Sequence, residues 1–136
     1  TAAAIVPVPL YPRRRAWRGF DQAELLSIPL GQALGLPVWT DVLARVRDTT
    51  PQVSVPGSER LDNVRNAFAV RKPWRLKGRR VILVDDVFTT GATISECARV
   101  LRDAGAEAVY ALTVARTAPP WHWASAQSDD LWGDEL

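Results

Sequence analysis

Short β-branched runs alternate with stretches of helical spacing along this chain. The apolar runs predict strands at residues 3–8, 42–47, 67–70, 81–84 and 108–115. Apolar residues spaced three and four apart predict helices at residues 22–34 and 94–104, and a short helix at about 58–66. This alternation is typical of an α/β protein.

Several residues punctuate these predicted elements. Gly35 and Gly105 are expected to end the two longer helices, and Ser58 to cap the short one. Pro29 lies inside the helix at 22–34 and is expected to kink or split it.

The clearest unit is a predicted strand at 81–84, a helix at 94–104 and a strand at 108–115. A short β-branched run of this kind is usually buried on both faces of a parallel sheet. Strand, helix and strand together predict a right-handed βαβ unit. We therefore expect a mostly parallel sheet flanked by helices.

With 136 residues, the chain has room for one ordinary domain, which we place at 1–117. Residues 118–136 contain Pro119, Pro120 and three tryptophans without any period, and we expect an irregular tail. No apolar run approaches the roughly 20 residues that cross a bilayer, and no signal peptide is visible. These features predict a cytoplasmic protein without a membrane span.

Two residue counts add to this picture. The chain has no methionine, so Thr1 is not an initiator, and we expect residues before it to have been lost or left out. The single cysteine, Cys97, excludes an internal disulfide and a multi-cysteine metal site within these residues. Its place in a helical pattern predicts a small buried side chain.

Charge is divided unevenly along the chain. Residues 1–80 hold 14 Lys and Arg against 6 Asp and Glu, whereas residues 81–136 hold 3 against 9. The basic part suits a polyanion such as pyrophosphate or nucleic acid, and the acidic part suits a metal ion and sugar hydroxyls.

The most informative segment is 81–93, in which two carboxylates follow the predicted strand and a Thr-Gly-rich turn leads into a helix. Ligands bind at the carboxyl ends of strands in open α/β sheets. A helix N-terminus offers unpaired N–H groups to a phosphate, while carboxylates accept hydrogen bonds from ribose hydroxyls or hold magnesium. The candidate residues are Asp85, Asp86, Thr89, Thr90, Gly91, Ala92 and Thr93. A structural role is the alternative for an acidic strand end or a Thr-Gly turn alone.

The same segment resembles the phosphoribosyl pyrophosphate signature of type I phosphoribosyltransferases. The resemblance implies that Asp85 and Asp86 contact the ribose hydroxyls and Mg2+. It also implies that residues 89–93 contact the 5-phosphate, and that the fold is the type I phosphoribosyltransferase one.

The first half of the chain resembles the ComF family of competence-associated phosphoribosyltransferase-like proteins. The resemblance covers about residues 4–117 and departs from the family pattern at Tyr11, Asp21 and Pro29. It implies a homodimer and a role in DNA uptake. The four-cysteine zinc ribbon common in that family is missing from these residues, so we expect no metal besides magnesium. Residues that carry the resemblance include Val6–Pro7–Val8–Pro9–Leu10, Pro12, Arg13, Arg14, Arg18, Gly19, Phe20, Gln22, Arg45, Thr49, Gln52, Arg60, Asn63, Ala67 and Phe68.

By the same resemblance, the loop at residues 10–22 holds pyrophosphate, with Arg13, Arg14 and Arg18 as candidate contacts. Arginine binds phosphate oxygens in bidentate fashion, although a solvated basic loop is the alternative. Residues 47–58 fall where type I enzymes have a mobile flap, which would carry Thr49, Pro51 and Gln52.

Two functions remain open at this point. One is an enzyme that transfers the phosphoribosyl group of phosphoribosyl pyrophosphate to an unidentified nucleophile and releases pyrophosphate. The other is a non-catalytic binding or adaptor protein that acts in DNA uptake, with DNA or the uptake machinery as partner. No general base is evident, because the one histidine, His122, lies in the irregular tail.

Overall fold

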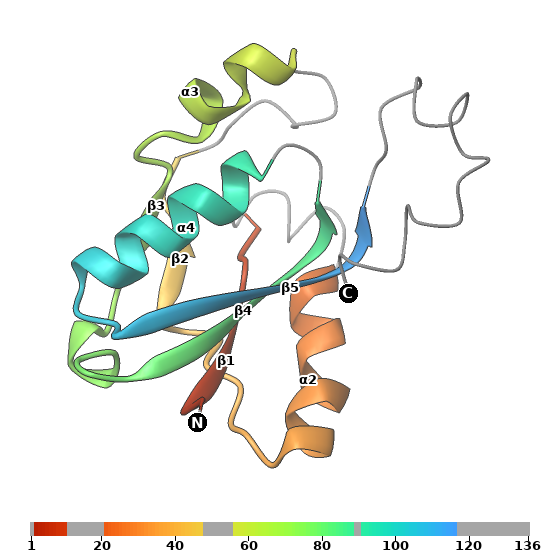
Figure 1. Cartoon of the computed structure of the whole chain (residues 1–136), viewed down its shortest axis with the longest axis vertical. Helices are drawn as coiled ribbons and strands as arrows, with labels where there is room; N and C mark the ends of the chain where they lie inside the picture. Colours follow the sequence, from red (N-terminus) through yellow and green to blue (C-terminus); the bar gives the residue numbers. More distant parts are fainter. Residues whose placement is uncertain (1, 11–20, 48–55, 89–90, 117–136) are drawn as a thin grey trace, which may run out of the picture.

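The computed structural model describes residues 2–10, 21–47, 56–88 and 91–116. Five strands and three α-helices occupy these residues, together with two short 3-10 helices (Figure 1). The elements are β1 (Ala4–Pro7), α2 (Gln22–Leu34), β2 (Leu43–Arg45), η2 (Gly57–Glu59), α3 (Arg60–Val64), β3 (Phe68–Val70), η3 (Pro73–Arg75), β4 (Arg80–Phe88), α4 (Ala92–Asp103) and β5 (Ala108–Arg116).

The central sheet is parallel, with the strand order β1-β4-β5. Val6 lies beside Leu83 and Asp85 beside Thr113, which sets the register of both pairs. Val38 forms an isolated parallel bridge to Ile5 at the β1 edge. The strands β2 and β3 form a separate antiparallel pair. The predicted α/β fold with a mostly parallel sheet and flanking helices is confirmed.

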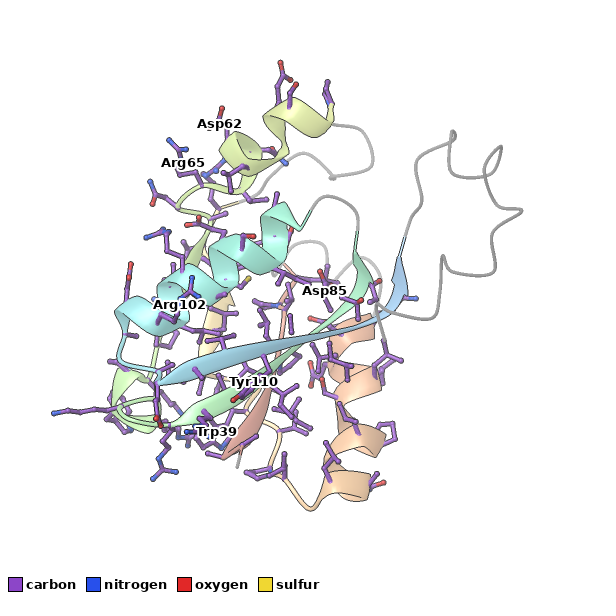
Figure 2. All side chains as sticks on the ribbon, in the orientation of Figure 1. Trp39, Asp62, Arg65, Asp85, Arg102 and Tyr110 are labelled. Atoms are coloured by element: carbon purple, nitrogen blue, oxygen red, sulfur yellow. The ribbon has the colours of Figure 1, made fainter. Side chains whose placement is uncertain are left out.

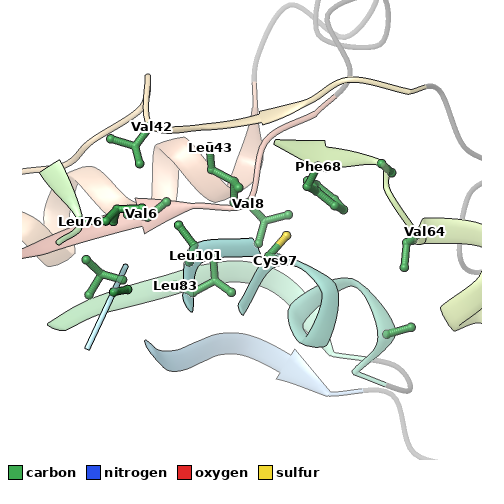
Figure 3. Close-up of a cluster of buried hydrophobic side chains, with 14 residues drawn as sticks. Val6, Val8, Val42, Leu43, Val64, Phe68, Leu76, Leu83, Cys97 and Leu101 are labelled. Carbon is green, nitrogen blue, oxygen red and sulfur yellow. The ribbon is translucent and has the colours of Figure 1, made fainter. Parts of the chain in front are cut away.

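The two long helices cover opposite faces of this sheet (Figure 1). Successive strand residues point to opposite faces, so Val6 and Leu83 share one face and Ile5 lies on the other. Val6 and Leu83 belong to the main core together with Cys97 and Leu101 of α4 (Figure 3). Helix α2 packs against the Ile5 face.

Helix α2 is held close to the sheet by small residues. Its buried side chains are Ala23 and Ser27, which lie one turn apart and are followed by the buried Gly31. A Cβ atom at Gly31 would lie 2.8 Å from the Leu36 carbonyl oxygen and 2.9 Å from Cγ2 of Val38, which bridges to Ile5, so only glycine fits here.

The expected split of this helix at Pro29 is wrong, because α2 runs without interruption from Gln22 to Leu34. Pro29 is exposed, so its ring faces solvent and not the sheet. The helix stays continuous because Ala23, Ser27 and Gly31, which we call the small-residue seam, pack against the sheet on the opposite side. This tertiary packing offsets the N–H that Pro29 lacks.

Two further expectations need correction. Ser58 does not cap α3: it lies inside η2, and the N-cap residue is Glu59, without a side-chain capping bond. Strand β4 extends to Phe88, well beyond the predicted end at Val84. It is longer because pairing with β5 continues through Asp85, Val87 and Phe88, although carboxylates have low strand propensity.

Cys97 is fully buried, as expected. Among the described residues, no helix is both long and apolar enough to cross a membrane. The expected boundary of the domain at residue 117 and the tail at 118–136 lie at or outside the limit of the described residues.

Candidate functional site

Asp85 and Asp86 lie near the carboxyl end of β4, the central strand of the parallel sheet (Figure 2). Asp85 follows Val81 and Leu83 on the face that packs against α4. Its Oδ1 accepts a hydrogen bond of 2.9 Å from the backbone N–H of Asp86. The two carboxylates predicted from the sequence are therefore adjacent, at the sheet edge where ligands bind in this fold class.

Asp85 has an unusual electrostatic environment. Burial raises the pKa of its carboxyl to about 7, with a further contribution from a hydrogen bond to the Asp86 side chain and from the Asp86 charge. A carboxyl pair that holds one proton near neutral pH is a common feature of binding and catalytic sites. A cation at this position would favour loss of that proton.

Arg45 is the positively charged residue that acts on the Asp85 carboxyl. Burial raises the pKa of the Cys97 thiol, as it raises that of Asp85, and the charge of Arg45 partly opposes both increases, so the guanidinium lies within electrostatic reach of both groups. It stacks over the Phe68 ring at 4.7 Å, on the neighbouring strand β3. Arg45 is among the residues that carry the ComF resemblance, but the sequence assigns it no role. The available signal was a single arginine within the otherwise apolar run 42–46 after Asp41.

Helix α4 starts beside the two carboxylates. Gly91 precedes it with φ 82°, a left-handed conformation that strongly favours glycine. The first bond of the helix runs from the Ser95 N–H to the Gly91 carbonyl oxygen at 2.8 Å. The amides of the turn before Ser95, including those of Ala92 and Ile94, thus point out of the N-terminal end of the helix. Gly91, Ala92 and Thr93 all lie at this end, as predicted.

A pocket of about 180 Å³ opens next to the carboxyl end of β1. It lies between the start of α2 and strand β2, and Arg45 lines it, so the pocket and Asp85 share this arginine. Its lining residues are Pro7, Pro9, Leu10, Asp21, Glu24, Thr40, Leu43, Ala44 and Arg45.

Asp21 fastens both ends of the segment that separates β1 from α2. It is buried, its Oδ2 accepts the Leu10 N–H at 3.0 Å, and its Oδ1 accepts the Glu24 N–H at 3.3 Å. The second bond caps α2. Asp21 departs from the family pattern, and its observed contacts give it a structural role.

Arg47 fixes both ends of the segment that follows β2. Its Nη2 donates to the carbonyl oxygens of Asn63, at 2.8 Å, and Arg65, at 2.7 Å. These bonds connect the end of the β2 region to the end of α3, across the predicted flap.

Several predicted residues lie outside the described part of the chain. They are the phosphate candidates Thr89 and Thr90, the pyrophosphate candidates Arg13, Arg14 and Arg18, the flap residues Thr49, Pro51 and Gln52, and His122. The described residues thus bring together Asp85, Asp86, Gly91, Ala92 and Thr93.

Magnesium would have a limited donor set from the protein. Within the described ranges, no group of three or more His, Cys, Asp or Glu side chains is arranged to hold a metal ion. Mg2+ is often held by one or two carboxylates together with substrate phosphates and water, so Asp85 and Asp86 fit this requirement.

Comparison with known proteins identifies the family and the fold. A profile of the phosphoribosyl transferase domain matches residues 23–125. The chain belongs to the phosphoribosyl transferase family. Solved structures with a similar fold include the glutamine phosphoribosylpyrophosphate amidotransferase of B. subtilis, with a TM-score of 0.56 and 24% identity over 83% of this chain and 22% of that one. An adenine phosphoribosyltransferase structure has a TM-score of 0.55 and 16% identity, covering 86% of this chain and 58% of the other.

Within this phosphoribosyl transferase family, the resemblance to ComF proteins is confirmed. The chain is 43% identical to Competence protein F of Haemophilus influenzae over 115 residues, which is 83% of this chain and 50% of the relative. It is 40% identical to the DNA utilization protein YhgH of Escherichia coli K12, covering 83% of this chain and 49% of that protein. The chain spans about half the length of the curated relatives it matches.

Proposed function

We propose that this phosphoribosyl transferase domain binds phosphoribosyl pyrophosphate with Mg2+ at the carboxyl end of β4. It would transfer the phosphoribosyl group to a nucleophile, with release of pyrophosphate. The observation that carries the proposal is the juxtaposition of the Asp85–Asp86 pair with the N-terminal end of α4. A phosphorylated pentose presents hydroxyls at one end and a phosphate at the other, which matches this arrangement of acceptors and donors.

The residues of the proposed site divide into three roles. Asp85 and Asp86 would accept hydrogen bonds from the ribose hydroxyls and supply the protein oxygens for Mg2+. The amides and hydroxyls of Thr89, Thr90, Gly91, Ala92 and Thr93 would hold the 5-phosphate. Arg13, Arg14 and Arg18 would hold the pyrophosphate, since their loop begins at Leu10 beside the pocket that Arg45 lines.

Transfer would rely on electrostatic stabilisation. The bond between the sugar and pyrophosphate breaks as the nucleophile bonds to the same carbon, so positive charge builds on the ring and negative charge on the leaving group. Bound magnesium would neutralise part of the leaving-group charge. The arginines would neutralise the remainder, and Asp85 and Asp86 in their ionised form would stabilise the positive ring.

Calorimetry with phosphoribosyl pyrophosphate and MgCl2 tests the binding step. We expect saturable binding to the unmodified chain and a loss of at least about a hundredfold in affinity in the double variant Asp85→Asn/Asp86→Asn, because two charge-assisted contacts are removed. The matched control is Asp62→Asn/Asp103→Asn, which removes two carboxylates that form exposed ion pairs with Arg65 and Arg99. It should bind as the unmodified chain does.

The absence of both heat and thermal stabilisation in the folded, unmodified chain would contradict the proposal. Equal losses in the two double variants would also contradict it, because the effect would then be one of net charge. Pyrophosphate release with a panel of bases and amines would test transfer separately.

A second candidate function is a binding or adaptor role in DNA uptake. It is favoured by the names of the relatives, a competence protein and a DNA utilization protein. Under this candidate the sugar phosphate site would serve binding alone. Failure of every acceptor to release pyrophosphate, with intact binding of phosphoribosyl pyrophosphate, would favour it over the enzyme.

A further inference from the structure

The connection between β3 and β4 is the most basic segment of the described chain. Residues 71–80 contain six basic residues and no acidic one. They are Arg71, Lys72, Arg75, Lys77, Arg79 and Arg80. This segment, which we call the basic edge, leads into the amino end of β4, whereas Asp85 lies near the carboxyl end of the same strand (Figure 2). It is therefore separate from the proposed sugar phosphate site.

The basic edge is fixed in place by its own fold. Leu76 is fully buried in the main core and anchors the middle of the segment. Successive turns are closed by the Arg75 N–H to the Lys72 carbonyl, the Leu76 N–H to the Pro73 carbonyl and the Arg79 N–H to the Leu76 carbonyl, at 2.9–3.1 Å. The Gly78 N–H also bonds to the Gly105 carbonyl oxygen, which ties the segment to the turn between α4 and β5. The charged side chains are thus displayed from an ordered backbone.

Neighbouring carboxylates neutralise only part of this charge. Asp41 pairs with Lys72 and with Arg75, and Glu107 pairs with Arg80. Six basic side chains against these two carboxylates leave a surplus of four positive charges. Arg71, Lys77 and Arg79 are all exposed. This density of positive charge suits a chain of phosphates.

An aromatic side chain stands among these cations. Trp74 is 70% exposed, the largest exposed fraction among the described large apolar residues. It lies in η3 between Lys72 and Arg75. An exposed indole costs free energy in water, and its flat face can stack on an unpaired base. Trp39, the other described tryptophan near this edge, is already covered by Arg75, whose guanidinium lies 5.6 Å from its ring (Figure 2).

From this combination we propose that the basic edge binds single-stranded nucleic acid. Arg71, Lys77 and Arg79 contact the phosphates, and Trp74 stacks on a base. A polyanion without bases would use the cations and leave Trp74 unused. A duplex would offer phosphates but would hide the faces of its bases, so the single strand matches both features of the surface. This inference gives the second candidate function a defined surface, and it does not depend on phosphoribosyl transfer.

Fluorescence anisotropy with a labelled oligodeoxythymidylate of about 20 nucleotides tests the proposal on the full chain. We expect Trp74→Ala to weaken binding about tenfold and Trp74→Phe to retain most of it, because loss of one stacked base is expected at about that size. The double variant Lys77→Gln/Arg79→Gln should flatten the slope of log K against log salt by about 1.4, at about 0.7 per phosphate contact on a single strand.

The matched control is Arg65→Gln/Arg99→Gln, which removes the same charge from two exposed positions away from this edge, just after α3 and on the side of α4 that faces Asn66. It should leave the salt slope unchanged. Thermal melting checks that every variant is folded. Asp85→Asn/Asp86→Asn should bind the oligonucleotide normally, which separates this test from that of the sugar phosphate site.

Three outcomes would overturn the proposal. One is no binding of the oligonucleotide by the unmodified chain, and another is an equal loss in the control double variant. The third is equal affinity for duplex DNA, polyglutamate or anionic phospholipid vesicles with no effect of Trp74→Ala, which would indicate a general surface of another kind. A parallel oligouridylate of the same length shows whether DNA or RNA is preferred.

Discussion

At the residue scale, Asp85 links the chemistry of the proposed site to the stability of the fold. Its carboxyl is mostly buried, and burial together with Asp86 raises its pKa to about 7. The folded protein therefore keeps this proton in a range of pH where the unfolded chain has lost it. Ionising the buried Asp85 carboxyl costs free energy, and a cation bound beside it would offset that cost.

This pKa predicts a pH dependence of stability. Between the ordinary carboxyl pKa of 3.8 and about 7, the folded state binds more protons at Asp85 than the unfolded state does, so this group's contribution to stability falls as pH rises. The slope is at most about 1.4 kcal/mol per pH unit, and it vanishes above pH 7.

Urea unfolding of Asp85→Asn should lack this part of the slope, while the exposed control Asp62→Asn keeps it. If Asp85→Asn and the unmodified chain have parallel profiles between pH 4 and 7, the raised pKa is wrong.

Asp21 fixes both ends of residues 11–20, which form most of the proposed pyrophosphate loop. Each of its two carboxylate oxygens accepts a separate backbone N–H, one on either side of residues 11–20. Asparagine, which the ComF resemblance leads one to expect here, has a single carbonyl oxygen and cannot reproduce both bonds in the same way. This chain therefore ties the base of its proposed pyrophosphate loop more firmly than asparagine would.

At the scale of elements, α2 combines a favourable seam with an unfavourable residue. Ala23, Ser27 and Gly31 bring it into close contact with β1. Pro29, in the same helix, removes one backbone hydrogen bond and exposes its ring to solvent. The seam is the stronger effect, since the helix continues for five residues beyond the proline.

Replacing this proline is therefore expected to stabilise the protein. Pro29→Ala restores the N–H and should raise the free energy of unfolding by about 1–3 kcal/mol, as measured by urea denaturation. Gln32→Ala, an exposed position one turn later, is the control and should change stability by less than about 0.5 kcal/mol. A lower stability in Pro29→Ala would show that the proline matches a local bend that alanine does not keep.

At the scale of the whole molecule, the parallel sheet separates two surfaces of different charge. The carboxyl ends of the strands carry Asp85 and Asp86 beside the start of α4, and the basic edge lies at the amino end of β4. Strand β4 has nine residues, and an extended strand rises about 3.3 Å per residue, so its two ends lie far apart. The proposed sugar phosphate and nucleic-acid sites should therefore be occupied independently.

Anisotropy measured at constant free magnesium tests this independence. Saturating phosphoribosyl pyrophosphate should change the affinity for the oligonucleotide by less than about twofold, because the two sites share no residue. Displacement of the oligonucleotide would instead place both ligands on one surface, and the basic loop at residues 10–22 would become the candidate.

Much of this arrangement followed from the order of residues. Periodicity and β-branched runs predicted the strands at residues 81–84 and 108–115 and the helix between them, because local sterics and burial on both faces select for such residues. The end of β4 was harder to predict, because Asp85 and Asp86 disfavour a strand in isolation and are held in one by pairing with β5. The helix at residues 22–34 was predicted with its observed ends, but its continuity through Pro29 was not, since the packing that supports it comes from β1.

The sequence by itself determined the fold class, the family and the pairing of two carboxylates with a Thr-Gly turn, because these depend on neighbours along the chain. Only the tertiary structure decided that Arg45 acts electrostatically on Asp85, that Asp21 and Arg47 fix the ends of the proposed pyrophosphate loop and of the predicted flap, and that residues 71–80 lie at the opposite end of β4 from Asp85. Charge, burial and hydrogen bonding act through space, so the pKa of a carboxyl depends on residues that are distant in the chain and close only after folding.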